Sequence, residues 1–161
     1  MRFEDLENLI KAATPVIEKN IASATKEAIE KSVKDSFETE SFAGRKWHPL
    51  SMQRKAAKAA AGYGNRKILQ ATQKMLKSGK VNTKKTERNS ILGTYDNPTL
   101  YAGLHQKGFI GDGEAIPQRQ FAPDDKKKEL PMKGKQEILT PLIYKAIDDV
   151  LKGVKQISRL I

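Results

Sequence analysis

The stretch Thr14–Phe37, TPVIEKNIASATKEAIEKSVKDSF, decides the fold of this chain. Its apolar residues recur at about the 3.6-residue spacing of a helical turn, and this pattern predicts a long amphipathic helix. They are Val16, Ile17, Ile21, Ala24, Ala28, Ile29, Val33 and Phe37. Thr14 before Pro15 is typical of a helix start, because threonine caps a first turn and proline tolerates the first helical position. Residues 1–14 are then an N-terminal segment that leads into this helix.

Two further pairs have the same form, Asn97-Pro98 and Thr140-Pro141, and each predicts a helix start. The first predicts a short helix from Pro98 to about Lys107, with Gly108 as its C-cap. The second predicts a long C-terminal helix. Its apolar stripe is Leu142, Ile143, Ala146, Ile147, Val150, Leu151, Val154 and Ile157.

The middle of the chain predicts smaller elements. Residues 52–61 and 68–76 have the composition of short helices, and residues 80–95 have the alternation of a β-hairpin with a polar turn. An isolated hairpin is marginal in water, so we expect it against the long helices or a neighbouring chain. Glycines and prolines in residues 108–131 predict an extended arm. The predicted fold class is α+β, a single domain over residues 1–161 in which two long helices pack on short helices and a small antiparallel sheet.

The charge of the chain is concentrated in one segment. The formal net charge is +11, and the segment from Arg45 to Arg88 holds 13 lysines or arginines and one acid, Glu87. Such segregation predicts a basic surface for a polyanionic or acidic partner. We assign to this surface Arg45, Lys46, Arg54, Lys55, Lys58, Arg66, Lys67, Lys74, Lys77, Lys84, Lys85 and Arg88.

Residues that carry chemistry are scarce. The chain has no cysteine, which excludes disulfides and thiolate metal sites, and its apolar runs are too short for a membrane span. Its two histidines, His48 and His105, lack neighbouring ligands at metal spacing. We therefore expect no cofactor, no metal and no enzymatic activity, and we expect His105 to hydrogen-bond a neighbouring loop. A hydrolase that uses His105 is one remaining alternative.

Aromatic residues among the cations leave a second alternative open. Trp47 and Tyr63 lie within the basic segment, and a nucleic-acid-binding protein uses aromatic rings there as stacking platforms. The context of Trp47, between a Gly-Arg-Lys run and His-Pro-Leu, favours a plug between two helices instead.

Four blocks of sequence, in this order and spacing, carry a family resemblance. They are Gly44–Leu50 (GRKWHPL), Ile68–Met75 (ILQATQKM), Tyr101–Gly108 (YAGLHQKG) and Ile116–Phe121 (IPQRQF). The chain resembles the virion morphogenesis, or tail completion, family of tailed bacteriophages. The residues that match its pattern are Trp47, Pro49, Leu50, Leu69, Thr72, Tyr101, Ala102, His105, Gly108, Pro117, Arg119 and Phe121. Gln73 and Met75 depart from it, because the family has glycine and leucine there. The departure at this turn predicts a continued helix in its place.

The resemblance implies a structural virion protein that forms a ring, commonly of six subunits, at the head-proximal end of the tail. Its partners are then further copies of itself and adjoining rings such as tail terminator and head-tail connector proteins. It implies location in the virion neck, and in the host cytoplasm during assembly. Tyr101, His105 and Gly108 shape the helix from which the arm leaves, and Arg119 and Phe121 anchor that arm on a neighbour. The basic segment faces either an acidic ring or genomic DNA, and we favour the ring because tightly held DNA would hinder ejection.

Overall fold

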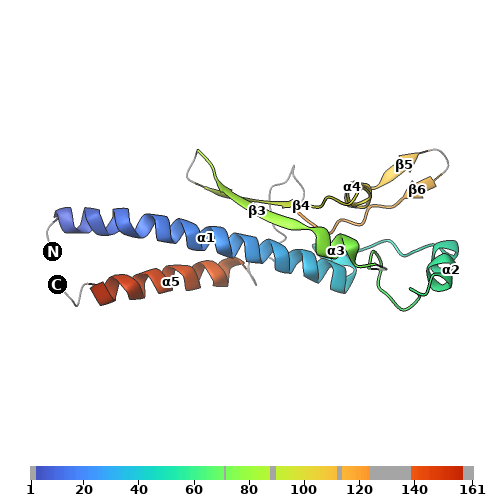
Figure 1. Ribbon diagram of the computed structural model, residues 1–161, viewed down its shortest axis with the longest axis horizontal. Coiled ribbons are helices and arrows are strands. Elements are labelled where there is room, and N and C mark those ends of the chain that lie inside the picture. The colour runs from blue at the N-terminus through green and yellow to red at the C-terminus, as the bar shows by residue number, and fades with distance from the viewer. Residues whose placement is uncertain (1–2, 71, 88–89, 112–113, 124–138, 158–161) are drawn as a thin grey trace.

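The computed structural model describes residues 3–70, 72–87, 90–111, 114–123 and 139–157. The molecule is elongated, and helix α1 (Phe3–Thr39) runs along most of its length (Figure 1). Its 37 residues correspond to about 55 Å at about 1.5 Å per residue. The predicted fold class, α+β with long terminal helices, is confirmed.

Helix α5 (Thr140–Ile157) lies antiparallel to the N-terminal half of α1, so that the first turns of α1 and the last turns of α5 lie at the same end of the molecule (Figure 1). We call α5 together with the N-terminal half of α1 the stalk. The predicted start of α5 at Thr140-Pro141 is confirmed. Among the described residues, no helix is both long and apolar enough to cross a membrane.

The other two helix starts predicted from proline pairs are wrong. Pro15 lies inside α1, where the Thr14 hydroxyl donates to the Ile10 carbonyl at 2.8 Å and therefore serves the preceding turn. Helix α4 (Ala102–Lys107) begins after Pro98, because the Asn97 side chain accepts from the Thr99 N–H at 3.2 Å and closes a local turn.

The predicted hairpin is confirmed and lies against α1. Strands β3 (Lys80–Lys85) and β4 (Ile91–Asp96) pair antiparallel, with Val81 opposite Tyr95. Gly93 allows the close approach, because a Cβ there would lie 2.5 Å from Ile29 Cδ1 and 2.9 Å from Thr25 Cγ2.

Short elements join the hairpin to α1. Strands β1 (Ser41–Phe42) and β2 (Arg45–Lys46) form a small hairpin that the sequence did not predict, and α2 (Met52–Ala60) confirms the first of the predicted short helices. The second, over residues 68–76 and ending at Ser78-Gly79, is confirmed in its last part only, since α3 (Lys74–Ser78) is helical and residues 68–70 are not. Leu69 and Gln73 interrupt it with left-handed backbone, at φ of 61° and 56°.

The predicted arm has two parts. Strands β5 (Phe109–Gly111) and β6 (Glu114–Ile116) form a third hairpin, which projects from the body of the molecule (Figure 1). Residues 117–123, which we call the return segment, then run back to the body of the molecule. Their apolar side chains are buried, so the prediction of an extended arm is wrong for this part of the chain. Residues 124–131 of the predicted arm lie outside the described residues.

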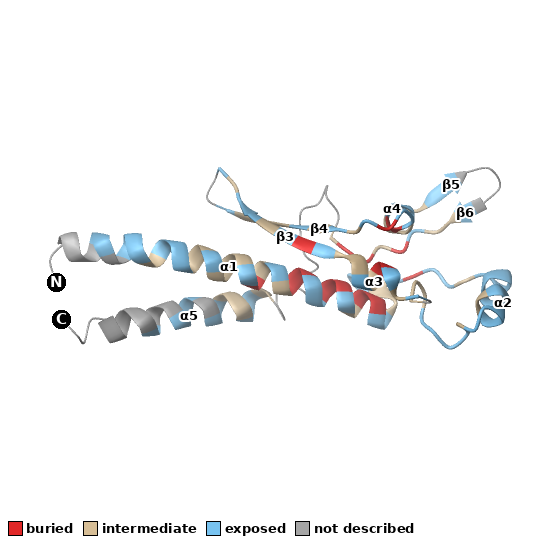
Figure 2. Cartoon of the chain, in the orientation of Figure 1, coloured by how far each residue is buried: buried red, intermediate tan, exposed pale blue. Residues whose placement is uncertain are grey.

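The core is small and off-centre. It lies where the C-terminal half of α1 meets α3, β3, α4 and the return segment, whereas little of the stalk is buried (Figure 2). Phe37 is fully buried at its centre, with its ring 5.5 Å from Trp47 and 5.3 Å from Phe121 between centroids. The members are Ile29, Val33, Phe37, Trp47, Met75, Val81, Ala102, Phe121 and Ala122.

Candidate functional site: a buried junction and the surfaces around it

The four sequence blocks that the resemblance singled out meet in the core. Trp47, Met75, Ala102 and Phe121 come one from each block and belong to a single cluster of buried residues. We call this cluster, with the hydrogen bonds around it, the motif junction. Blocks that lie apart in the sequence are therefore neighbours in space.

Trp47 plugs the junction, as its sequence context predicted. It is buried, its ring packs edge-on against Phe37, and its Nε1 donates to the Gln120 carbonyl at 2.6 Å. A buried indole with its N–H satisfied has no face for a base. The prediction that Trp47 is a stacking platform for nucleic acid is therefore wrong.

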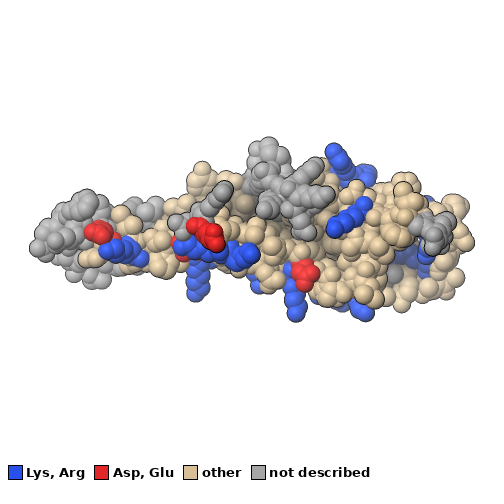
Figure 3. All heavy atoms as spheres, turned by 90° about the horizontal axis from the view of Figure 1, so that it is seen from above, with Lys and Arg blue, Asp and Glu red and all other residues tan. Residues whose placement is uncertain are grey.

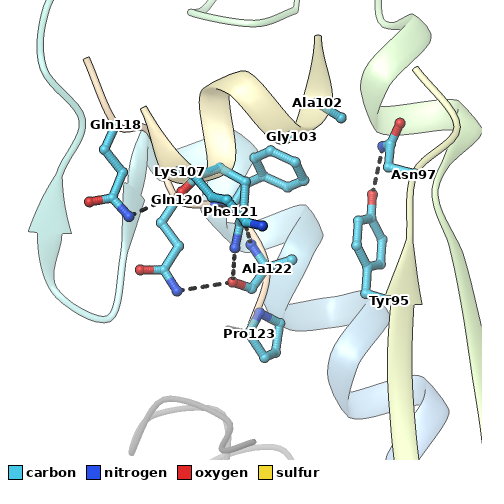
Figure 4. Close-up of a pocket in the computed structure, with 11 residues that line it drawn as sticks. Tyr95, Asn97, Ala102, Gly103, Lys107, Gln118, Gln120, Phe121, Ala122 and Pro123 are labelled. Atoms are coloured by element: carbon cyan, nitrogen blue, oxygen red, sulfur yellow. Dashed lines mark hydrogen bonds between the residues drawn. The ribbon is translucent and has the colours of Figure 1, made fainter. Parts of the chain in front are cut away.

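Gln106 fastens the return segment to α4. Its Oε1 accepts from the backbone N–H groups of Phe121 at 3.1 Å and Ala122 at 3.3 Å, and its Nε2 donates to the Ala122 carbonyl at 2.7 Å. Figure 4 shows this region, in which the return segment lies beside α4 and the Gln120 side chain also reaches the Ala122 carbonyl. The sequence analysis missed Gln106, whose only signal was its place between His105 and Gly108 in a matched block.

We call the three hydrogen bonds of the Gln106 side chain to the return segment the clamp, and a small cavity lies beside it. Its volume is about 240 Å³, and Tyr95, Asn97 and Phe121 contribute to its wall (Figure 4). Asn97 holds two elements there, because its Nδ2 donates to the Met75 carbonyl at 2.6 Å and to Tyr95 Oη at 3.1 Å. Burial raises the pKa of the Tyr95 hydroxyl above its usual range.

Arg119 and Phe121 do not anchor an arm on a neighbour, because only 4% and 2% of their surfaces are exposed. The Arg119 N–H donates to the His105 carbonyl at 2.7 Å, and its Nε donates to the His48 carbonyl at 3.0 Å. These bonds tie the return segment to α4 and to the Trp47 block. The position of both residues is explained by the fold of their own chain.

His105 is held differently from our expectation. Its backbone carbonyl bonds the return segment, but its Nδ1 is buried and has no hydrogen-bond partner in the part of the chain that the structure describes. The ring packs edge-on against Tyr101, with centroids 6.3 Å apart. Burial and, secondly, the nearby Arg119 charge lower the pKa of His105.

The remaining matched positions shape turns and walls. Gly108 ends α4 with a φ of 75°, and a Cβ there would lie 3.1 Å from the Gln118 nitrogen. Leu69 packs against the core, and the Thr72 hydroxyl accepts from the Lys74 N–H at 3.3 Å. Pro49, Leu50 and Pro117 line a second cavity, described below.

Gln73 adopts the backbone conformation that glycine favours. Its φ of 56° lies in the left-handed region, and its carbonyl accepts from the Lys77 N–H at 3.0 Å. The expectation of a continued helix here is wrong, and the turn is present with glutamine in place of glycine.

The basic residues are exposed for the most part but are spread along the molecule. They lie on β2, α2, α3, β3 and the loop before α3, and α2 is at one end of the molecule while β3 runs toward the other (Figure 1). Figure 3 shows basic groups at several places along the molecule. Clustering in sequence therefore does not give one compact patch.

Several of these cations serve the fold itself. Lys58 Nζ donates to the carbonyls of Arg66 and Lys67, Lys67 Nζ donates to the Glu38 carbonyl at 2.5 Å, and Lys85 pairs with Glu18 at 2.6 Å. Arg88 lies outside the described residues. A partner-binding role for the others stays a prediction.

The described residues contain no group of three or more His, Asp or Glu side chains placed to hold a metal ion. No protein-family model, no curated protein and no solved structure matches the chain.

Proposed function

We propose that this protein is a structural virion component of a tailed bacteriophage, which completes the tail and joins it to the head. The observation that carries the proposal is the motif junction. Trp47, Met75, Ala102 and Phe121, from the four blocks of the tail completion pattern, pack together in one core. Such a junction is what the pattern would encode if it specified a shared fold.

The turn at Gln73 also supports the proposal. The family pattern has glycine at this position, and the backbone there is left-handed, with a φ of 56°. A non-glycine residue in that conformation is uncommon, so the glycine of the pattern has a physical reason that this chain retains.

Exposed apolar side chains support assembly into a ring of identical subunits. The resemblance implies six subunits in this ring. On the stalk, Ile10 and Tyr144 are 58% and 70% exposed, and on the projecting β5–β6 hairpin Ile110 is 90% exposed. A two-helix stalk and a projecting hairpin leave such residues in water unless neighbours cover them. In this proposal adjoining subunits do so.

Adjoining rings, such as the tail terminator and the head-tail connector, would cover the exposed lysines and arginines of α2 and α3. In the assembled virion these cations face either acidic protein surface or genomic DNA. During infection the subunits would be made in the host cytoplasm and end in the neck of the virion.

Electron microscopy of lysates tests the proposal directly. The reading frame is disrupted in the phage that encodes it, and a complemented lysate serves as the control. Full heads that lie apart from unattached tails are the expected result. Normal infectious virions from the disrupted phage would exclude the completion role.

Ring formation is tested on the purified protein by light scattering after size exclusion and by negative staining. Ile110→Asp should lower the mass of the assembly while the circular dichroism of the subunit stays unchanged. Asn82→Asp is the matched control, since it adds the same charge at an exposed site of the β3–β4 hairpin. Equal assembly by both variants would remove the β5–β6 hairpin from the interface.

The alternative, a free nucleic-acid-binding protein, retains one supporting observation, the exposed cations of α2 and α3. Binding of a fluorescently labelled oligonucleotide, measured by anisotropy, distinguishes it. Several phosphate contacts would lower the affinity by orders of magnitude between low and physiological salt. Absence of binding at low salt would exclude this alternative.

A further inference from the structure

A second cavity lies next to the motif junction. Its volume is about 580 Å³, and it is enclosed by the loop before α2, the first turn of α2, the His105 side of α4 and the segment after β6. Prolines and aliphatic side chains form much of its wall, and the charged or titratable residues in that wall are His48, Arg54, His105 and Arg119. Among the residues that the structure describes, no carboxylate lines it. The cavity is within the size range of ligand sites, which is about 300–1,000 Å³.

Arg119 is the strongest indication that this cavity binds something. Its side chain lines the cavity although only 4% of its surface is exposed. A guanidinium carries five N–H donors, and Arg119 uses Nε for the His48 carbonyl at 3.0 Å. Within the described part of the chain its remaining donors have no acceptor, and no carboxylate forms an ion pair with it.

A buried cation without a counter-charge is unfavourable, and proteins normally pair it. Loss of hydration lowers the pKa of Arg119, but an arginine stays charged at any physiological pH. The free energy of the folded chain therefore falls when an anion reaches the guanidinium.

The surroundings add positive potential from other elements. Helix α2 begins at the cavity with Ser51 as its N-cap and has no acidic residue in its first turn, so its N-terminal N–H groups favour an anion. Arg54 lies in that first turn. His105 presents a buried Nδ1 that has no partner among the described residues. The charges of Arg54 and Arg119, the N-terminal N–H groups of α2 and the remaining N–H donors of Arg119 thus lie around one cavity.

We propose that this cavity binds the carboxylate of an acidic peptide segment from a partner protein, with the Arg119 guanidinium as its main contact. The planar fork of a guanidinium matches a carboxylate in two parallel hydrogen bonds. The walls formed by Pro49, Leu50, Ile116 and Pro117 suit apolar residues that flank the acid, whereas a nucleic-acid backbone needs an open basic track. The inference stands on this cavity and holds whether or not the protein belongs to a phage tail.

Titration of the full chain with blocked tripeptides tests the proposal. The probes are acetyl-Leu-Glu-Leu-amide and its neutral twin acetyl-Leu-Gln-Leu-amide, and the readout is the NMR shift of the Arg119 Nε–H and of the His105 ring. The glutamate peptide should give a saturable shift with an affinity at least about tenfold tighter than that of its twin. Equal affinities, or a linear response without saturation, would overturn the proposal.

Competition separates peptide from phosphate. Inorganic phosphate and a short oligonucleotide are added at constant ionic strength to the peptide complex. Weak displacement of the peptide by both supports the proposal. Displacement by the oligonucleotide at lower concentration than by free glutamate peptide would overturn it in favour of nucleic acid.

One matched pair of variants and one single variant complete the test. Arg54→Gln should weaken the glutamate peptide by about three- to tenfold, because it removes a charge at the cavity, and Lys55→Gln on the same helix should change it less than about twofold. Arg119→Met, checked for native circular dichroism, should abolish the preference for glutamate over glutamine. Equal effects of the Arg54 and Lys55 variants would refute a localised site, and this comparison remains decisive even if the Arg119 variant does not fold.

Discussion

Replacement of Gln106 by leucine should destabilise the chain, because this half-buried side chain holds residues 117–123 to α4. Three hydrogen bonds join this side chain to the backbone of Phe121 and Ala122. A typical intramolecular hydrogen bond contributes about 1 kcal/mol net, so the expected loss is about 3 kcal/mol. For a chain of this size that lowers the melting temperature by about 6–12 °C.

Urea unfolding followed by the fluorescence of Trp47, which is buried in the motif junction, measures this loss. Gln106→Glu is the informative comparison, because the carboxylate keeps an acceptor for both N–H groups but turns a second oxygen, in place of the donor, toward the Ala122 carbonyl. Its stability should therefore lie below that of wild type at neutral pH. Gln118→Leu is the control, since Gln118 is exposed and donates one bond, to the Gln106 carbonyl at 3.0 Å. It should cost less than about 1 kcal/mol.

A refuting result is a Gln106→Leu variant within about 0.5 kcal/mol of wild type, the range of ordinary surface substitutions. The return segment would then be held by the burial of Phe121 alone, and the clamp would have no energetic importance.

Three other perturbations test separate parts of the structure. Burial and a nearby guanidinium lower the pKa of His105 below its usual 6.5, so the unfolded chain binds a proton first as pH falls. Stability should be complete above about pH 7 and decline below about 6.5. Urea midpoints measured at both ends of this pH range should show that His105→Asn flattens the slope. A Cβ on Gly79 would overlap the ring of Tyr95 on β4, so Gly79→Ala should lower the free energy of unfolding by about 1–3 kcal/mol. Gly103 on α4 has open space around the position of a Cβ, so Gly103→Ala should raise the free energy of unfolding by about 0.5–1 kcal/mol. Gln73→Gly should leave the free energy of unfolding unchanged or raise it by up to about 1 kcal/mol, because the left-handed backbone no longer carries a side chain, and a loss beyond 1 kcal/mol would contradict the strain argument.

The elements with strong periodicity were predictable from the sequence. The apolar stripe of Thr14–Phe37 identified α1, and the alternation in residues 80–95 identified the β3–β4 hairpin, because in both cases one face must be buried. The burial of Trp47 in the junction was correctly predicted from the residues that flank it in the sequence.

Local signals failed where a side chain found a different hydrogen bond. Thr14 bonds the preceding turn in place of capping the next one, and Asn97 closes a turn before α4. The return of residues 117–123 to the core could not be predicted, because it depends on Gln106 and on contacts with Trp47 and His48 that lie far away in sequence. Hydrogen bonds between residues far apart in the sequence produce no periodic pattern of apolar residues that could predict them.

The division of α1 between a core and a stalk affects how unfolding is observed. Trp47, the chain's only tryptophan, is buried in the junction and reports on that half, whereas α1 and α5 dominate the helical signal of circular dichroism. Local opening of a sparsely buried region needs less free energy than global unfolding. In the isolated subunit the helical signal should therefore begin to decline before the fluorescence changes. In the ring that we propose, subunits that cover the stalk would make the two transitions coincide.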